Sequence, residues 1–339
     1  MSFNRRTTLL GTVAAAAMVL SAATAGAQDD RSYILTTATT GGTYYPVGVA
    51  IATLVKVKLQ NAEGIDMAAI SSAGSGENVG LMRDGQAQFG ILQGLFGRYA
   101  ANGSGPLENE GPQEWLRSVG MLWQNVEHFI VTDEFIDVGT IDDMAGVEGE
   151  PFSIGARNSG TEGSGRAILG GLGIDPESFD LVYQGYGPSA EALQNGTIVG
   201  VNMPGGVPVT GVTQAFAARD DLTILNFTED QITRANGGDG ELWTAYTIPA
   251  GSYPNQDEDV QTIAQPNFLG VHQDVDEEAV YLITKTMFEN LGFLQNIHPA
   301  TKAMSLEAAL AGLPAPLHPG AARFFGEVGV EIPERLIAN

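Results

Sequence analysis

The 339-residue sequence contains no cysteine and has few basic residues. The absence of cysteine excludes disulfide bonds, thiolate metal sites, iron–sulfur clusters and cysteine nucleophiles. Only 16 Lys and Arg stand against 40 Asp and Glu, which gives a formal net charge of -24. A polyanion gains nothing from counterion release on nucleic acid, and anionic membrane surfaces repel it. The composition therefore predicts that nucleic acid is not a partner.

Long apolar runs are also scarce, because no segment beyond the N-terminus approaches the roughly 18 apolar residues that a membrane span requires. The one apolar stretch, residues 9–20, follows Arg5 and Arg6 and precedes the small residues Ala25-Gly26-Ala27. This pattern is typical of a secretory signal peptide. We expect residues 1–27 to be cleaved and the mature chain to be exported, most simply to a bacterial periplasm. Cleavage leaves 14 basic residues against 40 acidic ones.

Short apolar strands alternate with helical segments along the mature chain, whose composition is 43% hydrophobic. Two series of strand, Gly/Ser-rich loop and helix follow one another. This alternation predicts an α/β fold with mostly parallel sheets flanked by helices. The predicted strands of the two series are residues 33–37, 65–71, 89–93, 152–156, 179–183, 198–203 and 222–226.

Two extended segments, near residues 125–132 and 245–255, predict a two-segment hinge between two domains. Residues 28–127 are expected to form the first part of domain I, and residues 128–248 to form domain II. Residues 249–339 then return to complete domain I with C-terminal helices. The chain is long enough for two such hydrophobic cores.

Two loops at predicted strand ends carry most of the chemical signal. In open α/β sheets, ligands bind beyond the carboxyl ends of the strands, where helix N-termini present free N–H groups to anions. Residues 41–44 and 159–162 are rich in Gly and hydroxyl side chains. They could face each other across a cleft and hold an anion. On spacing alone, ordinary helix N-caps and turns explain the same residues.

Four other side chains have both a functional and a structural explanation. Arg157 follows a strand end and either pairs with a ligand carboxylate or bridges one of the many surface acids. Gln93 closes a buried strand and either reaches a ligand or satisfies nearby backbone. Tyr44 and Tyr253 either wall an apolar pocket or pack in the core.

Motifs for catalysis and metal binding are missing from the sequence. There is no phosphate-binding Gly-x-x-x-x-Gly-Lys loop, no Gly-x-Gly-x-x-Gly and no Gly-x-Ser-x-Gly elbow. The four histidines are far apart and lack the spacing of metal ligands, and no loop has the calcium-binding spacing. We therefore predict no catalytic residues, no metal and no cofactor.

The run Thr40-Gly41-Gly42-Thr43-Tyr44-Tyr45-Pro46-Val47-Gly48 resembles the opening signature of the TAXI family, the solute receptors of one branch of tripartite ATP-independent periplasmic (TRAP) transporters. Further matches follow in order along essentially the whole mature chain. They are residues 75–78, residues 89–93, residues 159–162, Gly205 with Pro208, and residues 248–249 with Tyr253.

The resemblance implies a hinged, two-domain periplasmic binding protein of type II-like architecture. Such a receptor closes on a small organic acid or acidic amino acid, glutamate-like or 2-oxoglutarate-like, and delivers it to integral membrane permease subunits of a TRAP transporter. One departure is the run Gly196-Thr197-Ile198-Val199-Gly200, which lacks the acid that the family often has there. The alternatives are a periplasmic ligand-binding module of a signalling system and a secreted carboxylate-dependent hydrolase or lyase.

In the predicted site, backbone N–H groups and hydroxyls hold a carboxylate, amide side chains orient the rest of the solute, and tyrosines cover it. The predicted ligand-binding residues are Gly41, Gly42, Thr43, Tyr44, Ser75, Asn78, Gln93, Arg157, Ser159, Gly160, Thr161, Glu162, Gly205, Pro208 and Tyr253.

Overall fold

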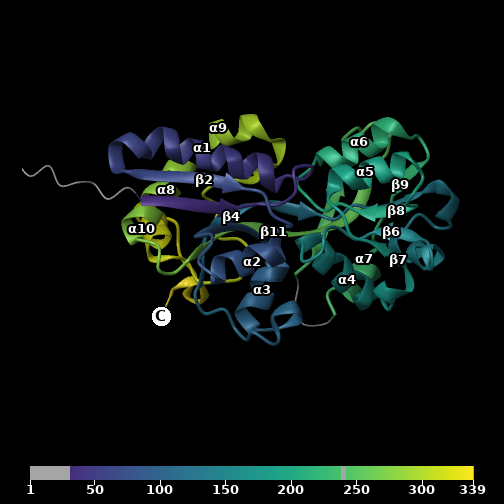
Figure 1. Ribbon diagram of the computed structural model, residues 1–339, viewed down its shortest axis with the longest axis horizontal. Helices are drawn as coiled ribbons and strands as arrows, with labels where there is room; N and C mark the ends of the chain where they lie inside the picture. Colours follow the sequence, from purple (N-terminus) through teal and green to yellow (C-terminus); the bar gives the residue numbers. More distant parts are fainter. Residues whose placement is uncertain (1–30, 238–241, 339) are drawn as a thin grey trace, which may run out of the picture.

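Two α/β lobes lie side by side in the computed structural model, which describes residues 31–237 and 242–338 (Figure 1). The predicted signal peptide, residues 1–27, lies outside the described residues. Each lobe is built on one β-sheet, and long strands run between the two.

The first lobe contains a six-stranded sheet in the order β10-β11-β3-β1-β2, with β4 also paired to β11. Strand β11 is the longest of the described strands, because it pairs with β3, β4 and β10 along different parts of its length. The strands are β1 (Arg31–Thr36), β2 (Ile65–Ile70), β3 (Phe89–Gln93), β4 (Leu116–Val126), β10 (Thr244–Ile248) and β11 (Val260–His272).

The second lobe contains a five-stranded sheet in the order β7-β6-β8-β5-β9. The chain enters this sheet directly after β4 and leaves it after β9, so the strands of this sheet come from one continuous segment. The strands are β5 (Phe129–Thr132), β6 (Pro151–Ser153), β7 (Asp180–Val182), β8 (Gly200–Asn202) and β9 (Leu222–Ile224).

Strand pairing is mixed, and the prediction of mostly parallel sheets holds only for part of each sheet. Strand β1 pairs in parallel with β2 and β3, and β6 pairs in parallel with β7 and β8. Strand β11 runs antiparallel to all its neighbours, as does β5. The strand–helix–strand alternation forces parallel pairing only where a helix crosses over. Strand β5 follows β4 directly and β11 follows β10 directly, with no helix between them, and both run antiparallel to their neighbours.

Helices cover both faces of each sheet. In Figure 1, α1 and α9 lie above the first sheet with α2 and α3 below it, and α5 and α6 lie above the second sheet with α4 and α7 below it. The helices are α1 (Tyr44–Glu63), α2 (Ser75–Arg83), α3 (Gly94–Asn102), α4 (Gly160–Leu172), α5 (Tyr186–Gln194), α6 (Thr210–Ala218), α7 (Glu229–Ala235), α8 (Glu277–Glu289), α9 (Leu291–Ile297) and α10 (Pro319–Glu327).

Two local predictions about helix ends can be compared directly with the structure. The sequence predicts that a helix ends near Leu172 with Gly173 as its cap, and Gly173 does cap α4 in the left-handed conformation with φ of 81°. Apolar residues at helical spacing after an acidic first turn predict one helix over residues 274–292. The structure has two helices there, α8 and α9, because Asn290 leaves the helical conformation between them.

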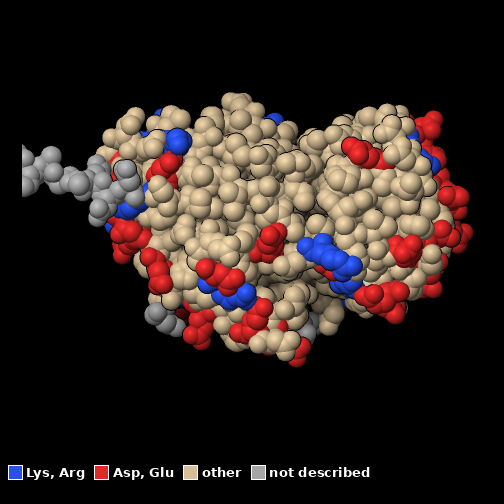
Figure 2. All heavy atoms as spheres, in the orientation of Figure 1, with Lys and Arg blue, Asp and Glu red and all other residues tan. Residues whose placement is uncertain are grey.

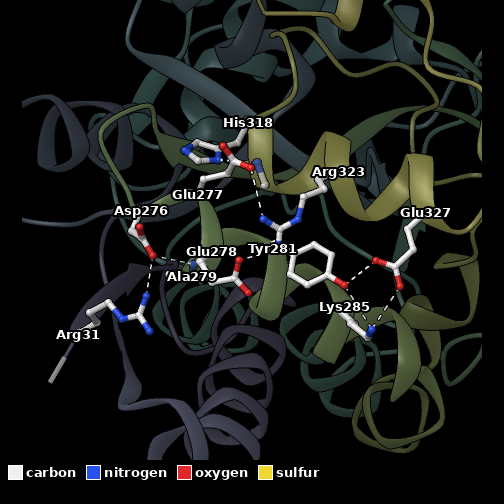
Figure 3. Close-up of polar contacts among 11 residues, drawn as sticks. Arg31, Asp276, Glu277, Glu278, Ala279, Tyr281, Lys285, His318, Arg323 and Glu327 are labelled. Atoms are coloured by element: carbon white, nitrogen blue, oxygen red, sulfur yellow. Dashed lines mark hydrogen bonds and ion pairs between the residues drawn. The ribbon is translucent and has the colours of Figure 1, made fainter. Parts of the chain in front are cut away.

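Ion pairs hold the outer elements of the first lobe together (Figure 3). Arg31 on β1 pairs with Asp276 at 2.6 Å. On α10, Arg323 pairs with Glu277 and Glu278 of α8, and its guanidinium lies 3.8 Å from the centroid of the Tyr281 ring. Exposed pairs of this kind each contribute little to stability. On the face shown in Figure 2, acidic side chains cover more of both lobes than basic side chains do.

Aromatic packing provides the tighter link between α8 and α10. Phe325 is fully buried, and its ring centroid lies 5.2 Å from that of Phe288 and 5.5 Å from that of Phe324. We predict that Phe325→Ala lowers the free energy of unfolding by about 3–5 kcal/mol, because it leaves a cavity between the two helices. Val328→Ala, next to the same helix at a side chain that is 41% exposed, is the matched control. Equal losses for the two variants in chemical denaturation would contradict the assignment of Phe325 to the core.

Candidate functional site

Four helices begin at one small cavity between the lobes. Helices α1 and α2 belong to the first lobe, and α4 and α5 to the second. Each follows a strand of the parallel part of its sheet, so the carboxyl edges of the two sheets face each other. The cavity has a volume of about 30 Å³ and is lined by Ala38, Thr39, Gly42, Thr43, Tyr44, Ala73, Gly74, Ser75, Gln93, Asn125, Gly160, Thr161, Tyr186 and Pro204.

Helix N-termini dominate the electrostatics of this cavity. The first N–H groups of a helix have no acceptor within that helix, and they carry a partial positive charge. In α1, α2 and α5 the N-cap residues are Thr43, Gly74 and Gly185, and no cap side chain accepts a hydrogen bond from these N–H groups. No Lys, Arg, His, Asp or Glu is among the described residues that line the cavity. The site is therefore suited to an anion held by backbone dipoles.

Hydrogen bonds join the two lobes around the cavity. Thr43 Oγ1 accepts from the N–H of Gly206 at 3.0 Å and donates to its carbonyl at 3.2 Å. The N–H of Gly211 donates to the carbonyl of Gly41 at 3.1 Å. On the other side, the N–H of Glu77 donates to the carbonyl of a loop residue preceding α4 at 2.9 Å. The structure is thus a closed arrangement of the lobes.

Glycine is required at positions around the cavity where the two lobes approach each other. A Cβ on Gly160 would lie 2.7 Å from Cδ and Oε1 of Gln93 and 2.9 Å from Oγ of Ser75. A Cβ on Gly41 would lie 2.8 Å from the backbone N of Gly187. These glycines therefore allow the lobes to close, because a larger side chain at either position would clash with the opposite lobe.

Neutral polar side chains supply the remaining recognition groups. Gln93 is 3% exposed and Asn125 is 1% exposed, and both line the cavity. Gln93 Oε1 and Asn125 Nδ2 are buried without a hydrogen-bond partner, which leaves one acceptor and one donor unused. Such atoms are commonly satisfied by water or a ligand.

Two tyrosines close the cavity walls, and both stay neutral. Burial raises the pKa of Tyr44 and of Tyr186 far above the ordinary value. Tyr186 donates to the carbonyl of Pro204 at 2.6 Å and is 2.7 Å from Oγ1 of Thr161. The hydroxyl of Tyr44 donates to Asn267.

The structure brings seven of the predicted site residues together on the cavity wall. Sequence reasoning missed Tyr186, although it begins a helix after a strand end just as Tyr44 does. It also missed Asn125, because β4 is buried almost throughout and shows no alternation that would single out one position. The predicted residues on the wall are Gly42, Thr43, Tyr44, Ser75, Gln93, Gly160 and Thr161.

Other predicted residues support the cavity from behind. Asn78 is fully buried, and its Nδ2 donates to the carbonyls of Thr37 at 2.7 Å and Ile91 at 2.9 Å. It therefore ties strands together and does not face the cavity. Ser159 caps α4 by accepting from the N–H of Glu162 at 3.0 Å, which is the ordinary capping role. The carboxylate of Glu162 accepts from the backbone N–H that precedes Ser159 and pairs with Arg166 at 3.3 Å.

Three predicted residues have partners elsewhere. Tyr253 lies inside the second lobe, where its hydroxyl is 2.7 Å from Nε2 of His128. Arg157 lies outside the cavity, with its guanidinium 3.6 Å from the ring centroid of Tyr183, a contact that sequence alone did not suggest. Gly205 exchanges backbone hydrogen bonds with Val126.

Pro208 follows a cis peptide bond with Val207 in the loop before α6 and is outside the cavity lining.

Within residues 31–237 and 242–338, no group of three or more His, Asp or Glu is arranged to hold a metal ion. In the same residues, none of the helices has the length and apolar character needed to cross a bilayer.

Solved structures with a similar fold include a protein from Bordetella bronchiseptica RB50, with a TM-score of 0.52 and 15% identity over 91% of this chain and 86% of that one. MatC from Rhodopseudomonas palustris with bound malate has a TM-score of 0.50 and 12% identity over 88% and 97%. The alkanesulfonate-binding protein SsuA from Xanthomonas axonopodis pv. citri bound to MOPS has a TM-score of 0.46 and 11% identity over 91% and 96%.

The α/β architecture of two sheets flanked by helices, which the sequence predicted, is also the fold of the Bordetella protein and of MatC. The model of the NMT1-like family matches residues 35–329. The chain therefore belongs to the NMT1-like family.

The close approach at Gly160 generates a prediction about closure. Gly160→Ala should leave each lobe folded but separate the two, because overpacking costs about 1–3 kcal/mol and only the closed arrangement has the clash. We expect a larger radius of gyration in small-angle X-ray scattering. Gly170→Ala on the same helix is the control, since a Cβ there meets nothing within 4 Å. If Gly160→Ala scatters like Gly170→Ala, Gly160 does not limit closure.

Proposed function

We propose that this protein is an extracytoplasmic solute receptor of the TAXI type, which captures a small organic acid or acidic amino acid and delivers it to the permease subunits of a TRAP transporter. The observation that carries this proposal is the convergence of four helix N-termini on one uncharged cavity between two lobes. Export by the predicted signal peptide would place the receptor in the periplasm.

Solute capture would follow from the division of the binding groups between the lobes. Helices α1 and α2 would hold the solute from the first lobe, and helices α4 and α5 from the second. Only the closed arrangement lets both sets of N–H groups contact one solute, so binding stabilises closure. The crossings at β4–β5 and at the segment before β11 would serve as the hinge.

The lining favours a compact anion with polar substituents. A carboxylate suits the N–H groups at Thr43, Ser75 and Gly160. Gln93 Oε1 could accept from a solute N–H or O–H, and Asn125 Nδ2 could donate to a second oxygen. The cavity volume of about 30 Å³ corresponds to two or three water molecules at roughly 10–15 Å³ each, so a solute of glutamate-like or 2-oxoglutarate-like size would enter as the lobes part.

Two further observations support a receptor for acids. Malate, which MatC was solved with, is a dicarboxylic acid, and MatC shares this fold. The only titratable side chains on the described cavity wall are Tyr44 and Tyr186, whose pKa values burial raises. A wall without a carboxylate, imidazole or amine favours binding over acid–base catalysis.

A thermal-shift screen tests the proposed ligand class. Dicarboxylates, oxoacids and acidic amino acids are compared with their uncharged amides, after native mass spectrometry of the purified protein for any retained solute. An acid at 100 times its Kd should add about 2.7 kcal/mol to the free energy of unfolding, while its amide adds nothing. If amides stabilise the protein as well as acids do, the anion assignment is wrong.

A charge placed at the cavity tests the site itself. Gln93→Glu should weaken binding of the acid found in the screen at least tenfold, or about 1.4 kcal/mol, because a second negative charge faces the solute. Gln60→Glu is the control, because it adds the same charge at an exposed position on α1. Isothermal titration calorimetry measures both Kd values. An unchanged Kd in Gln93→Glu would remove this cavity from the proposal.

A further inference from the structure

A single carboxyl group is buried where the chain crosses between the lobes. Glu127 lies between β4 and β5, two residues beyond Asn125, and its side chain is fully buried. Its N–H donates to the carbonyl of Ile263 at 2.9 Å, and its carbonyl accepts from Oγ1 of Thr262 at 2.9 Å. The backbone of the crossing is thus held in place, and the carboxyl is held with it.

The groups around this carboxyl are uncharged and solvate it incompletely. Asn202 on β8 donates to Oε2 at 3.0 Å. Ser164, Gln265 and Trp243 also lie near enough to favour the ionised form. However, Glu127 Oε1, Gln265 Nε2 and Trp243 Nε1 have no hydrogen bond of normal geometry. Burial outweighs these donors and raises the pKa of Glu127 to about 7.

Both lobes contribute to this burial. In the first lobe, the N–H of Leu95 on α3 donates to Oε1 of Gln265 at 2.7 Å, and Leu95 packs into the core of the second lobe. Across from it, a Cβ on Gly163 of α4 would lie 2.5 Å from the ring of Phe96. Helices α3 and α4 therefore pack together beside Gln265 and Ser164, two of the groups that surround the carboxyl. Separation of these helices would admit water to Glu127 and return it toward the behaviour of an ordinary carboxyl.

We propose that Glu127 takes up a proton when the lobes close, so that closure of this protein is coupled to protonation at the crossing. The proposal goes beyond solute recognition, because the coupling exists without any solute. A negatively charged solute would strengthen it by disfavouring a second negative charge nearby, a consequence that rests on the proposed function.

Neighbouring titratable groups do not change charge in the same range. Tyr44 on α1 and Tyr186 on α5 feel the charge of Glu127, and burial keeps both neutral by raising their pKa values. His128 follows Glu127 in the chain, and burial lowers its pKa to about 4. On α4, β8, β11 and the segment before β10, the facing side chains are Ser164, Asn202, Gln265 and Trp243, which do not titrate.

The direction of the pH effect follows from the raised pKa. The closed arrangement binds the proton more tightly than the open one, so closure is favoured as pH falls below about 7. Closure weakens as pH rises through that value. The closure equilibrium should be about tenfold more favourable near pH 6 than near pH 8.

The absence of cysteine makes the test direct, because two introduced cysteines can be labelled without background. Val57→Cys on α1 and Val138→Cys in the second lobe place spin labels at sites that are 71% and 65% exposed. Interlobe distances are measured by double electron–electron resonance on the full chain without added solute, near pH 6 and near pH 8. We expect about a tenfold shift toward the shorter distance at the lower pH.

Two further variants assign the effect to one residue. Glu127→Gln mimics the protonated carboxyl and should remain closed at both pH values, whereas Glu148→Gln, at an exposed site of the second lobe, should respond like the parent. Distances independent of pH in the parent, or an equal pH response in Glu127→Gln, would overturn the proposal. If Glu127→Gln does not fold, infrared spectroscopy of the unmodified protein replaces it. A protonated-carboxyl band should then be present near pH 6 and lost near pH 8. A spectrum without such a band near pH 6 would overturn the proposal.

This test is independent of the solute screen. A pH-dependent closure with no acid bound in the screen would leave the role of Glu127 standing and the proposed ligand class refuted. Binding of an acid without pH-dependent closure would support the proposed ligand class and refute the role of Glu127.

Discussion

The positive ends of four helix dipoles meet in one small volume, and the rest of the structure is organised around that constraint. Partial charges of like sign repel, so the convergence is unfavourable unless something negative or polarisable lies between the helices. Carbonyl and hydroxyl oxygens supply part of this compensation: the carbonyl of Asn158 accepts from the N–H of Glu77 on α2, and Oγ of Ser159 accepts from the N–H of Glu162 on α4. An anion would supply the remainder, so the same electrostatic term links solute binding to closure.

Closure in turn explains features that have no role within either lobe alone. Gly41 and Gly160 are small because the opposite lobe occupies the space of their missing side chains. The hydroxyl of Thr43 bonds to Gly206 across the interface, although its position would allow it to cap α1. Glu127 is deprived of water for the same reason. The size or the bonding of each of these residues is explained by contacts between the two lobes.

Sequence patterns predicted most of the strands and the alternation of strands with helices, because apolar periodicity and Gly or hydroxyl residues at strand ends are local signals. They did not predict α3 or α7. Gly160 and Thr43 were identified in this way. The antiparallel course of β11 was not predictable, since strand direction depends on partners far away in the chain. Tyr253 was assigned to the cavity by residue type, but the β10–β11 connection directs it to His128. Glu127 gave no signal, because its burial arises from segments distant in sequence.

The uncharged cavity wall also bears on the environment in which this acidic protein can work. Dissolved salt weakens interactions between exposed charges, including the pairs of Arg323 with Glu277 and Glu278, much more than it weakens interactions in a dry interior. When the lobes are closed, a site made of backbone dipoles holds its field in the interior, away from the mobile ions of the solvent. Binding at such a site does not depend on the charge of the surface. The surface can therefore become more acidic, or adapt to high salt, without a change in the residues that line the cavity.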